Sequence, residues 1–255
     1  MQLAVLVLFV NKFYLDMSWR KEECKMRNLN FKVIVDGMLI VTLLLSMAYL
    51  LIGIDNHEIV GTVFFILFIV HIILNRRWFF SVFKGKYSGM RIFFIGLNFL
   101  IFVMMIGLII SGMIFATYTP NFIKTANSIE MARLLHLLTA YWCFVLLSLH
   151  LGTNLTPIVN AIKLNDMYKE LIRFAGILLA CYGVFAFVRQ NIISYLFLQQ
   201  GFVFFNINQS LSGCLMDYIA IMSFGTMVGY SIKRLFIKIN LCKMSKEMKI
   251  KSGVD

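Results

Sequence analysis

The sequence predicts an all-α fold, a polytopic membrane helical bundle with six transmembrane helices. Hydrophobic residues make up 60% of the 255 residues and charged residues only 14%, which is more apolar surface than a soluble core of this size needs. Several apolar runs approach the roughly 20 residues that cross a bilayer. The runs are continuously apolar, whereas the strands of a membrane β-barrel would alternate between apolar and polar residues.

The predicted spans follow one another with short polar or basic segments between them. A ten-residue apolar opening, "MQLAVLVLFV", is too short to cross a bilayer, and no positive region precedes it, so we do not expect a signal peptide. We expect an interfacial segment there, or a start site assigned too far upstream. The six predicted spans cover about 33–54, 58–75, 91–115, 132–152, 171–193 and 214–237.

The distribution of Lys and Arg predicts the orientation of these spans. Of the 24 Lys and Arg residues, 21 lie in the terminal segments and in the two loops on the same side, and the other side holds only Lys124, Arg133 and Arg189. Because cytoplasmic loops carry the positive excess, both termini are predicted to be cytoplasmic. The net charge of +12 therefore indicates membrane topology and contact with anionic lipid, and we expect no nucleic-acid partner.

Several common functional motifs are missing from the sequence. The five cysteines form neither a CxxC nor a CxxCH motif, which argues against covalent haem attachment and against an obvious zinc site. No GxGxxG, P-loop or nucleophile-elbow pattern is found. We therefore expect no nicotinamide-binding module in this chain.

The four histidines form two pairs with the same spacing. His57 and His71 bracket "HEIVGTVFFILFIVH", and His136 and His150 bracket "HLLTAYWCFVLLSLH". Fourteen residues of α-helix return to within about 40° of the starting direction and advance about 21 Å. Since the second and fourth spans run in the same direction, His57 and His136 should lie at one depth, which we call the outer level. His71 and His150 should lie at the other depth, the inner level.

Two histidines at each level suggest ligands to a macrocycle. A tetrahedral zinc site needs three or four protein ligands, and the two levels are too far apart to share one metal. Two imidazoles suffice when a porphyrin supplies the other four ligands, and helix bundles build such sites from facing side chains. Ionisable groups at bilayer depth are also costly and are usually functional. We therefore expect two non-covalent haem b groups, one at each level.

Four neighbouring residues are candidate contacts of these groups. Gly61, one turn from His57 on the same face, would leave clearance for a flat ring, and Arg133, Arg76 and Arg77 could pair with propionates. Each also has a structural interpretation, because glycine in membrane helices is often a packing site and arginine at a helix end is often a topology signal.

The stretch "HEIVGTVFFILFIVHIILNRRW", 57–78, resembles the signature of the flavinylation-associated transmembrane cytochromes of bacteria. The preceding "VDGMLIVTLLLSMAYLLIG" is similar in character to the first span of that family, and His136 and His150 match its second ligand pair. The resemblance is specific over 33–78, looser through the fourth span, and limited to hydropathy in the last two spans. The helix plan is also similar to cytochrome b and to the membrane domain of ferric reductases.

The resemblance implies a b-type cytochrome of the bacterial cytoplasmic membrane with a four-helix haem core. It implies electron transfer to an extracytosolic flavin-carrying protein, from a cytoplasmic donor or a quinol, and leaves a bound quinone open. No flavin or FMN-attachment domain is expected here, so the chain would be the electron-transfer subunit of an oxidoreductase system. The predicted organisation is an N-terminal arm over 1–32, a di-haem core over 33–155, two further spans with an outer interfacial segment over 156–240, and a basic tail over 241–255.

Two other functions remain open at the level of sequence. A membrane transporter could use the histidines as a proton relay or as transient metal ligands, although the spans lack the broken helices typical of such proteins. A subunit that only anchors or assembles a partner would not need the histidines. The outer segment over 194–213 is apolar but interrupted by polar residues, so it is predicted either to lie in the membrane interface, to dock a partner, or to form an ordinary loop.

Overall fold

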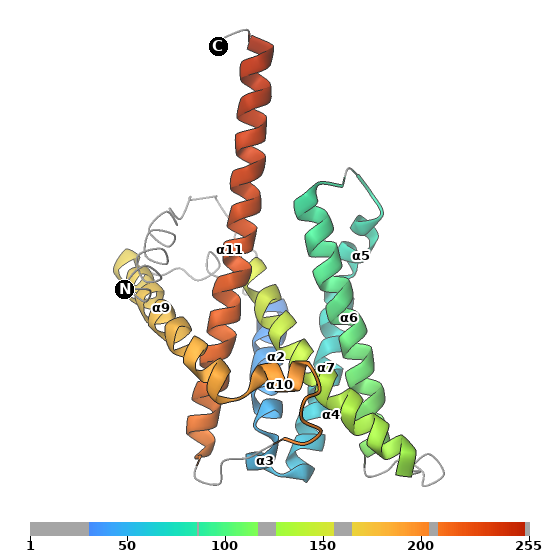
Figure 1. Cartoon of the computed structure of the whole chain (residues 1–255). Helices are drawn as coiled ribbons and strands as arrows, with labels where there is room; N and C mark the ends of the chain where they lie inside the picture. Colours follow the sequence, from blue (N-terminus) through green and yellow to red (C-terminus); the bar gives the residue numbers. More distant parts are fainter. Residues whose placement is uncertain (1–30, 86, 117–125, 156–164, 204–208, 253–255) are drawn as a thin grey trace.

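The protein is described from a computed structural model, which covers residues 31–85, 87–116, 126–155, 165–203 and 209–252 (Figure 1). Most of the predicted N-terminal arm lies outside these residues, as do Lys124 and part of the outer segment. Within the described ranges the chain forms only helices and their connections. The all-α prediction is therefore confirmed for these ranges.

The described parts of the chain form nine helices. α2, α4, α6 and α7 belong to the predicted core, and α9 and α11 are the additional long helices. The bounds are α2 Phe31–Met47, α3 Tyr49–Ile52, α4 Ile54–Leu74, α5 Arg76–Val82, α6 Gly89–Phe115, α7 Ala126–Thr153, α9 Asp166–Arg189, α10 Ile192–Leu196 and α11 Leu211–Ser252.

Five helices in the described ranges are long and apolar enough to cross a membrane, which supports a multi-pass membrane protein. They are α4, α6, α7, α9 and α11, and their apolar windows have mean hydropathies of 1.4 to 2.7. The predicted span over 33–54 is instead divided between α2, which has 17 residues, and the short α3. The break falls at Ala48, and Gly53 then takes a φ of 84° before α4 begins. A sixth span thus stays a prediction.

The core consists of two helix pairs. α2 packs against α4, and α6 packs against α7, while α4 and α7 have no extensive backbone contact in the described residues. α11 packs against both α7 and α9, so it joins the second pair to the rest of the bundle. Figure 1 shows α4 and α7 rising in one direction, with α11 extending beyond them at the C-terminal end. The parallel direction predicted for the second and fourth spans is therefore observed.

Glycines allow the closest of these helix contacts. A Cβ atom at Gly229 would collide with the backbone carbonyl of Leu149 on α7, and one at Gly225 would come within 2.6 Å of Ser148 Cβ. On α6, a Cβ at Gly107 would come within 2.8 Å of the Thr139 side chain. Small residues permit such backbone approach in membrane helices. The glycine pair on α11 and Gly107 thus have a packing role.

A buried carboxylate holds the outer ends of α9 and α11 together. Asp217 is fully buried and accepts hydrogen bonds from the Arg189 guanidinium, the Tyr182 hydroxyl at 2.8 Å, Gln190 Nε2 at 2.7 Å and Gln209 Nε2 at 2.9 Å. These four donors satisfy a charge that would be costly to bury alone. The cluster therefore ties the C-terminal end of α9 to the beginning of α11.

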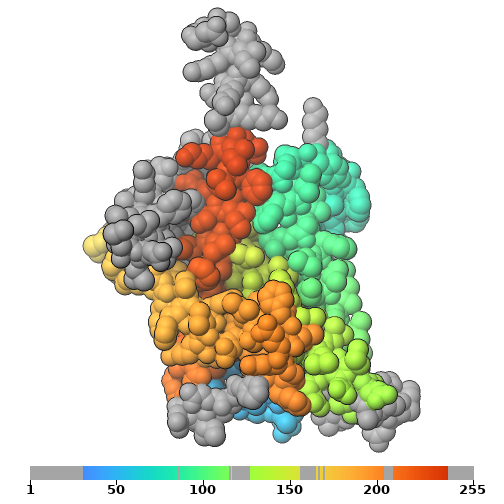
Figure 2. All heavy atoms as spheres, viewed as in Figure 1, coloured from blue at the N-terminus to red at the C-terminus, as the bar shows by residue number. Residues whose placement is uncertain are grey.

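The beginning of the outer segment packs against its own chain. Tyr195 on α10 is buried and stacks on Tyr141 of α7, with ring centroids 4.4 Å apart. Trp142 Nε1 donates a hydrogen bond to the Leu196 carbonyl at 3.0 Å. Figure 2 shows this part of the chain, in yellow to orange, covering the lower part of the displayed face beside α7. The described part of the segment thus forms one wall of the bundle.

Candidate functional site

The outer level brings the two predicted histidines close together. His57 lies in the first turn of α4, and His136 lies about three turns after the start of α7. Their ring centroids are 6.1 Å apart, with an angle of 74° between the ring planes. Imidazole nitrogens bind a metal at about 2.0–2.1 Å, so two imidazoles on opposite sides of one metal atom have ring centres about 6.3 Å apart. The observed separation matches that value. The two rings are therefore spaced as a pair of ligands to a single metal centre would be.

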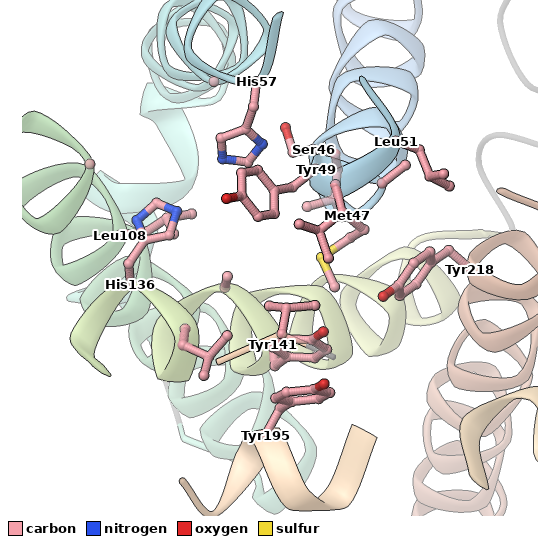
Figure 3. A pocket seen from close by; sticks show the side chains of 18 of the residues that line it. Ser46, Met47, Tyr49, Leu51, His57, Leu108, His136, Tyr141, Tyr195 and Tyr218 are labelled. Carbon is pink, nitrogen blue, oxygen red and sulfur yellow. The ribbon is translucent and has the colours of Figure 1, made fainter. Parts of the chain in front are cut away.

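A large cavity surrounds these two rings. Its volume is about 1250 Å³, above the range of about 300–1,000 Å³ usual for small-molecule sites. Figure 3 shows His57 and His136 directed into it, with Tyr49 beside them and Tyr141 farther along. The Tyr49 ring makes an edge contact with His57 at 5.2 Å between centroids. The cavity lies between the helix pairs, where α4 and α7 lack backbone contact.

Gly61 widens this cavity on the α4 side. It lines the cavity, and a Cβ atom built on it would meet nothing within 4 Å. Packing therefore does not require a glycine at this position, unlike at Gly229. The predicted clearance beside His57 is present. On the opposite wall, Gly112 of α6 lies against the His136 ring, where a Cβ would be 3.7 Å from Cε1.

The Nδ1 atoms of the outer histidines differ in their partners. His136 Nδ1 lies 3.1 Å from Ser111 Oγ, and this hydroxyl donates its own proton to the Gly107 carbonyl at 2.7 Å. The serine oxygen is thus left to accept from His136 Nδ1–H. His57 Nδ1 is buried without a hydrogen-bond partner. A buried unpaired ring nitrogen is unusual and marks a group that is not satisfied by the protein alone.

The inner histidines are held more firmly through Nδ1. His71 Nδ1 lies 2.6 Å from Asp36 Oδ1 of α2, and His150 Nδ1 lies 2.8 Å from Asn98 Oδ1 of α6. Both acceptors are oxygens, so each ring carries its proton on Nδ1. His71 and His150 are also near enough to interact electrostatically. The two inner histidines are therefore near each other, and their binding of one shared group stays a prediction.

With Nδ1 hydrogen-bonded, Nε2 of the inner histidines has only longer contacts, with asparagine amides. Asn75 Nδ2 is 3.4 Å from both ring nitrogens of His71, which places it over the ring face, and Asn154 Nδ2 is 3.4 Å from His150 Nε2. Neither contact has the distance of a normal in-plane hydrogen bond. Metal-binding histidines commonly donate their second ring N–H to a carboxylate or another oxygen in this way. Three of the four histidines thus have the hydrogen bonding expected of metal ligands.

The three arginines predicted to pair with propionates lie around the two levels, and none of their recorded contacts is with a histidine ring. Arg133 lines the outer cavity, and its guanidinium lies 4.8 Å from the centre of the Phe202 ring. Arg76 and Arg77 are exposed in the first turn of α5, directly after the inner end of α4. Contact of these three side chains with propionates stays a prediction.

Sequence reasoning missed three residues that hold the histidines. Asp36, Asn98 and Ser111 lie on α2 and α6, each as a polar residue within an apolar helix. The sequence shows one regularity around the inner histidines, but it does not point to these three residues. Both inner histidines are followed four residues later by asparagine, in "HIILN" and "HLGTN". In each case the asparagine amide donates to the histidine carbonyl, at 2.9 Å for Asn75 and 3.0 Å for Asn154.

The described residues contain no cluster of three or more His, Cys, Asp or Glu side chains that could hold a metal ion without other ligands. Comparisons of the chain with protein-family models, curated proteins and solved structures found no match. Inference about function therefore depends on the geometry of the site.

Proposed function

We propose that the chain is a di-haem b-type membrane cytochrome that transfers electrons across the bacterial cytoplasmic membrane. His57 and His136 would hold the outer haem, and His71 and His150 the inner one. Bound haem supplies an iron that accepts and releases one electron reversibly. The main observation in support is the pairing of His57 and His136, whose ring separation of 6.1 Å suits one metal between them.

The chain's residues would orient the ligands and make room for the rings. Ser111, Asn98 and Asp36 contact Nδ1 of three histidines, so they would fix the orientation of these rings and leave Nε2 as the atom that binds the iron. Gly61 and the gap between α4 and α7 leave space for a planar group at the outer level. Apolar walls such as Phe64 and Met105 would keep water from that space.

Two levels separated by about 21 Å of helix give electrons a route between the membrane faces. With both termini in the cytoplasm, the inner level would face a cytoplasmic donor or a quinol, and the outer level an extracytosolic flavoprotein. These partners are carried over from the resemblance of 57–78 to the flavinylation-associated cytochromes. In this arrangement no charged side chain needs to move through lipid.

The test is the absorption spectrum of the purified protein in detergent after expression with a sufficient haem supply. We expect a reduced-minus-oxidised spectrum of low-spin haem with two imidazole ligands, and a pyridine haemochrome assay should give two haem b per chain. A variant in which all four histidines are replaced by alanine is the control and should carry no haem. A folded wild-type protein without a haem band would refute the proposal.

One observation favours a second candidate, a transporter that moves protons or metal ions. The 2.6 Å contact between Asp36 and His71 joins two ionisable side chains that are each about a third exposed, 37% and 29% respectively. Such pairs also occur in proton pathways of membrane proteins. Metal or proton uptake into vesicles by a haem-free protein, lost in the Asp36→Asn variant, would favour this function.

A further inference from the structure

The acceptors of the four Nδ1 atoms differ in charge between the two levels. At the inner level His71 donates to the Asp36 carboxylate at 2.6 Å and His150 donates to the Asn98 amide at 2.8 Å. At the outer level the contacts are with neutral groups: His136 Nδ1 lies 3.1 Å from Ser111 Oγ, and the backbone of Leu108 also faces the His136 ring. His57 Nδ1 has no hydrogen-bond partner. The inner level therefore has the shorter hydrogen bonds and the only carboxylate among these acceptors.

This difference bears on how strongly each histidine donates electrons to a metal. A hydrogen bond from Nδ1–H to a carboxylate pulls the proton away from the ring and makes Nε2 more basic. A more basic ligand stabilises the oxidised, more positive metal, so it lowers the reduction potential. A nearby negative charge acts in the same direction. A neutral or missing acceptor has a weaker effect.

Cations lie near both levels, and Arg76 and Arg77 follow directly after the inner end of α4. At the inner end, Lys32 Nζ is 3.4 Å from Asn75 Oδ1, and Lys233 Nζ donates to the Thr153 carbonyl at 2.7 Å. At the outer end, Arg133 lines the cavity. Positive charge is thus present at both ends, and Lys32, Lys233 and Arg133 contact groups other than the four histidine rings. The direct contact of His71 with Asp36 is shorter than any of these contacts.

We propose that Asp36 makes the inner level the site of lower reduction potential, so that electrons pass energetically downhill from the inner to the outer level. The proposal rests on the proposed function and adds the residue that gives its electron transfer a favourable direction. Each transfer oxidises the inner site by one electron and reduces the outer site by one electron, with no bond made or broken. Asp36 acts through His71 and is therefore a positioning residue.

The experiment is a potentiometric titration of the purified haem-loaded protein, followed at the haem absorption band. The wild-type protein should show two components of different potential. In the Asp36→Asn variant, which keeps an oxygen acceptor but removes the charge, the lower component should shift to higher potential while the upper one stays in place. The Asn98→Asp variant adds a carboxylate at the same level and should shift the lower component further down.

Two control variants assign the components to the levels. Ser111→Ala should shift the upper component alone, and His150→Ala should remove or convert the lower one. The proposal is overturned if Asp36→Asn leaves the lower component unmoved, or if His150→Ala removes the upper component. Two haems with unaltered potentials in Asp36→Asn would overturn this inference and leave the proposed function standing, whereas a haem-free wild type would overturn both.

Discussion

Replacing His136 with alanine is expected to lower the haem content from two to one per chain. The inner level lies about 21 Å away along the helix, so His71 and His150 keep their own contacts. Loss of the hydrogen bond between His136 and Ser111 costs about 1 kcal/mol. Since whole domains are stable by about 5–15 kcal/mol, the variant should stay folded, and the missing absorbance should report a missing ligand.

Double variants make the assay sharper, because they test which histidines share a haem. His57→Ala combined with His136→Ala removes both ligands of one level, so it should retain one haem, as each single variant does. His136→Ala combined with His150→Ala removes one ligand from each level and should retain none. Effects within one site are non-additive in this way, whereas effects at separate sites add. Haem per chain is measured by pyridine haemochrome, and folding is checked by circular dichroism.

The reasoning would be refuted if the two double variants had equal haem content. It would also be refuted if His136→Ala lost both haems while its helix content and elution volume matched those of the wild type. In either case the four histidines would not be divided into an outer and an inner pair.

Three further predictions concern the packing around the site. Asp217→Ala should lower the free energy of unfolding in detergent by about 3 kcal/mol. This lies at the lower end of the cost of breaking a buried ion pair, because the arginine left behind is 44% exposed. As a control, Asp55→Ala at an exposed site should leave the melting temperature within error of wild type. Gly229→Ala should destabilise the folded protein by about 1–3 kcal/mol, because the added Cβ clashes with α7. Gly176→Ala is the control and should have no such effect, because the space around its Cβ is open. Equal melting temperatures for the two variants would contradict this account. Gly61→Trp should fill the cavity, so the folded variant should lose the outer haem and keep the inner one. Gly61→Ala should retain both haems. Two haems in Gly61→Trp would show that the cavity is not the binding site.

The helices could be predicted from the sequence because each depends on its own apolar run. α4, α6 and α7 contain the predicted spans with small shifts at their ends. The pairing of His57 with His136 was also predictable, because helix periodicity and the alternating direction of spans determine it. The break at Ala48 was not predictable, since the residues on either side of it are as apolar as the rest of the span.

The residues that hold the histidines could not be identified in the same way. Asp36 and Asn98 lie 35 and 52 residues from their partners, and their contacts depend on the rotation and depth of α2 and α6 relative to α4 and α7. Hydropathy contains no information on either quantity. The contact of Ser111 with His136 is also hard to recognise from the sequence. Serines in membrane helices usually donate a hydrogen bond to the preceding turn, as Ser111 also does.

The absence of extensive contact between α4 and α7 has a consequence for stability. The α2–α4 hairpin and the α6–α7 hairpin share buried apolar residues, among them Leu43, Phe64 and Met105, and they also enclose the cavity between them. Whatever fills that cavity contributes its binding free energy to the assembly of the two halves. Under the proposed function, haem would therefore add to the stability of a bundle that already folds without it, and the melting temperature in detergent should rise with haem content.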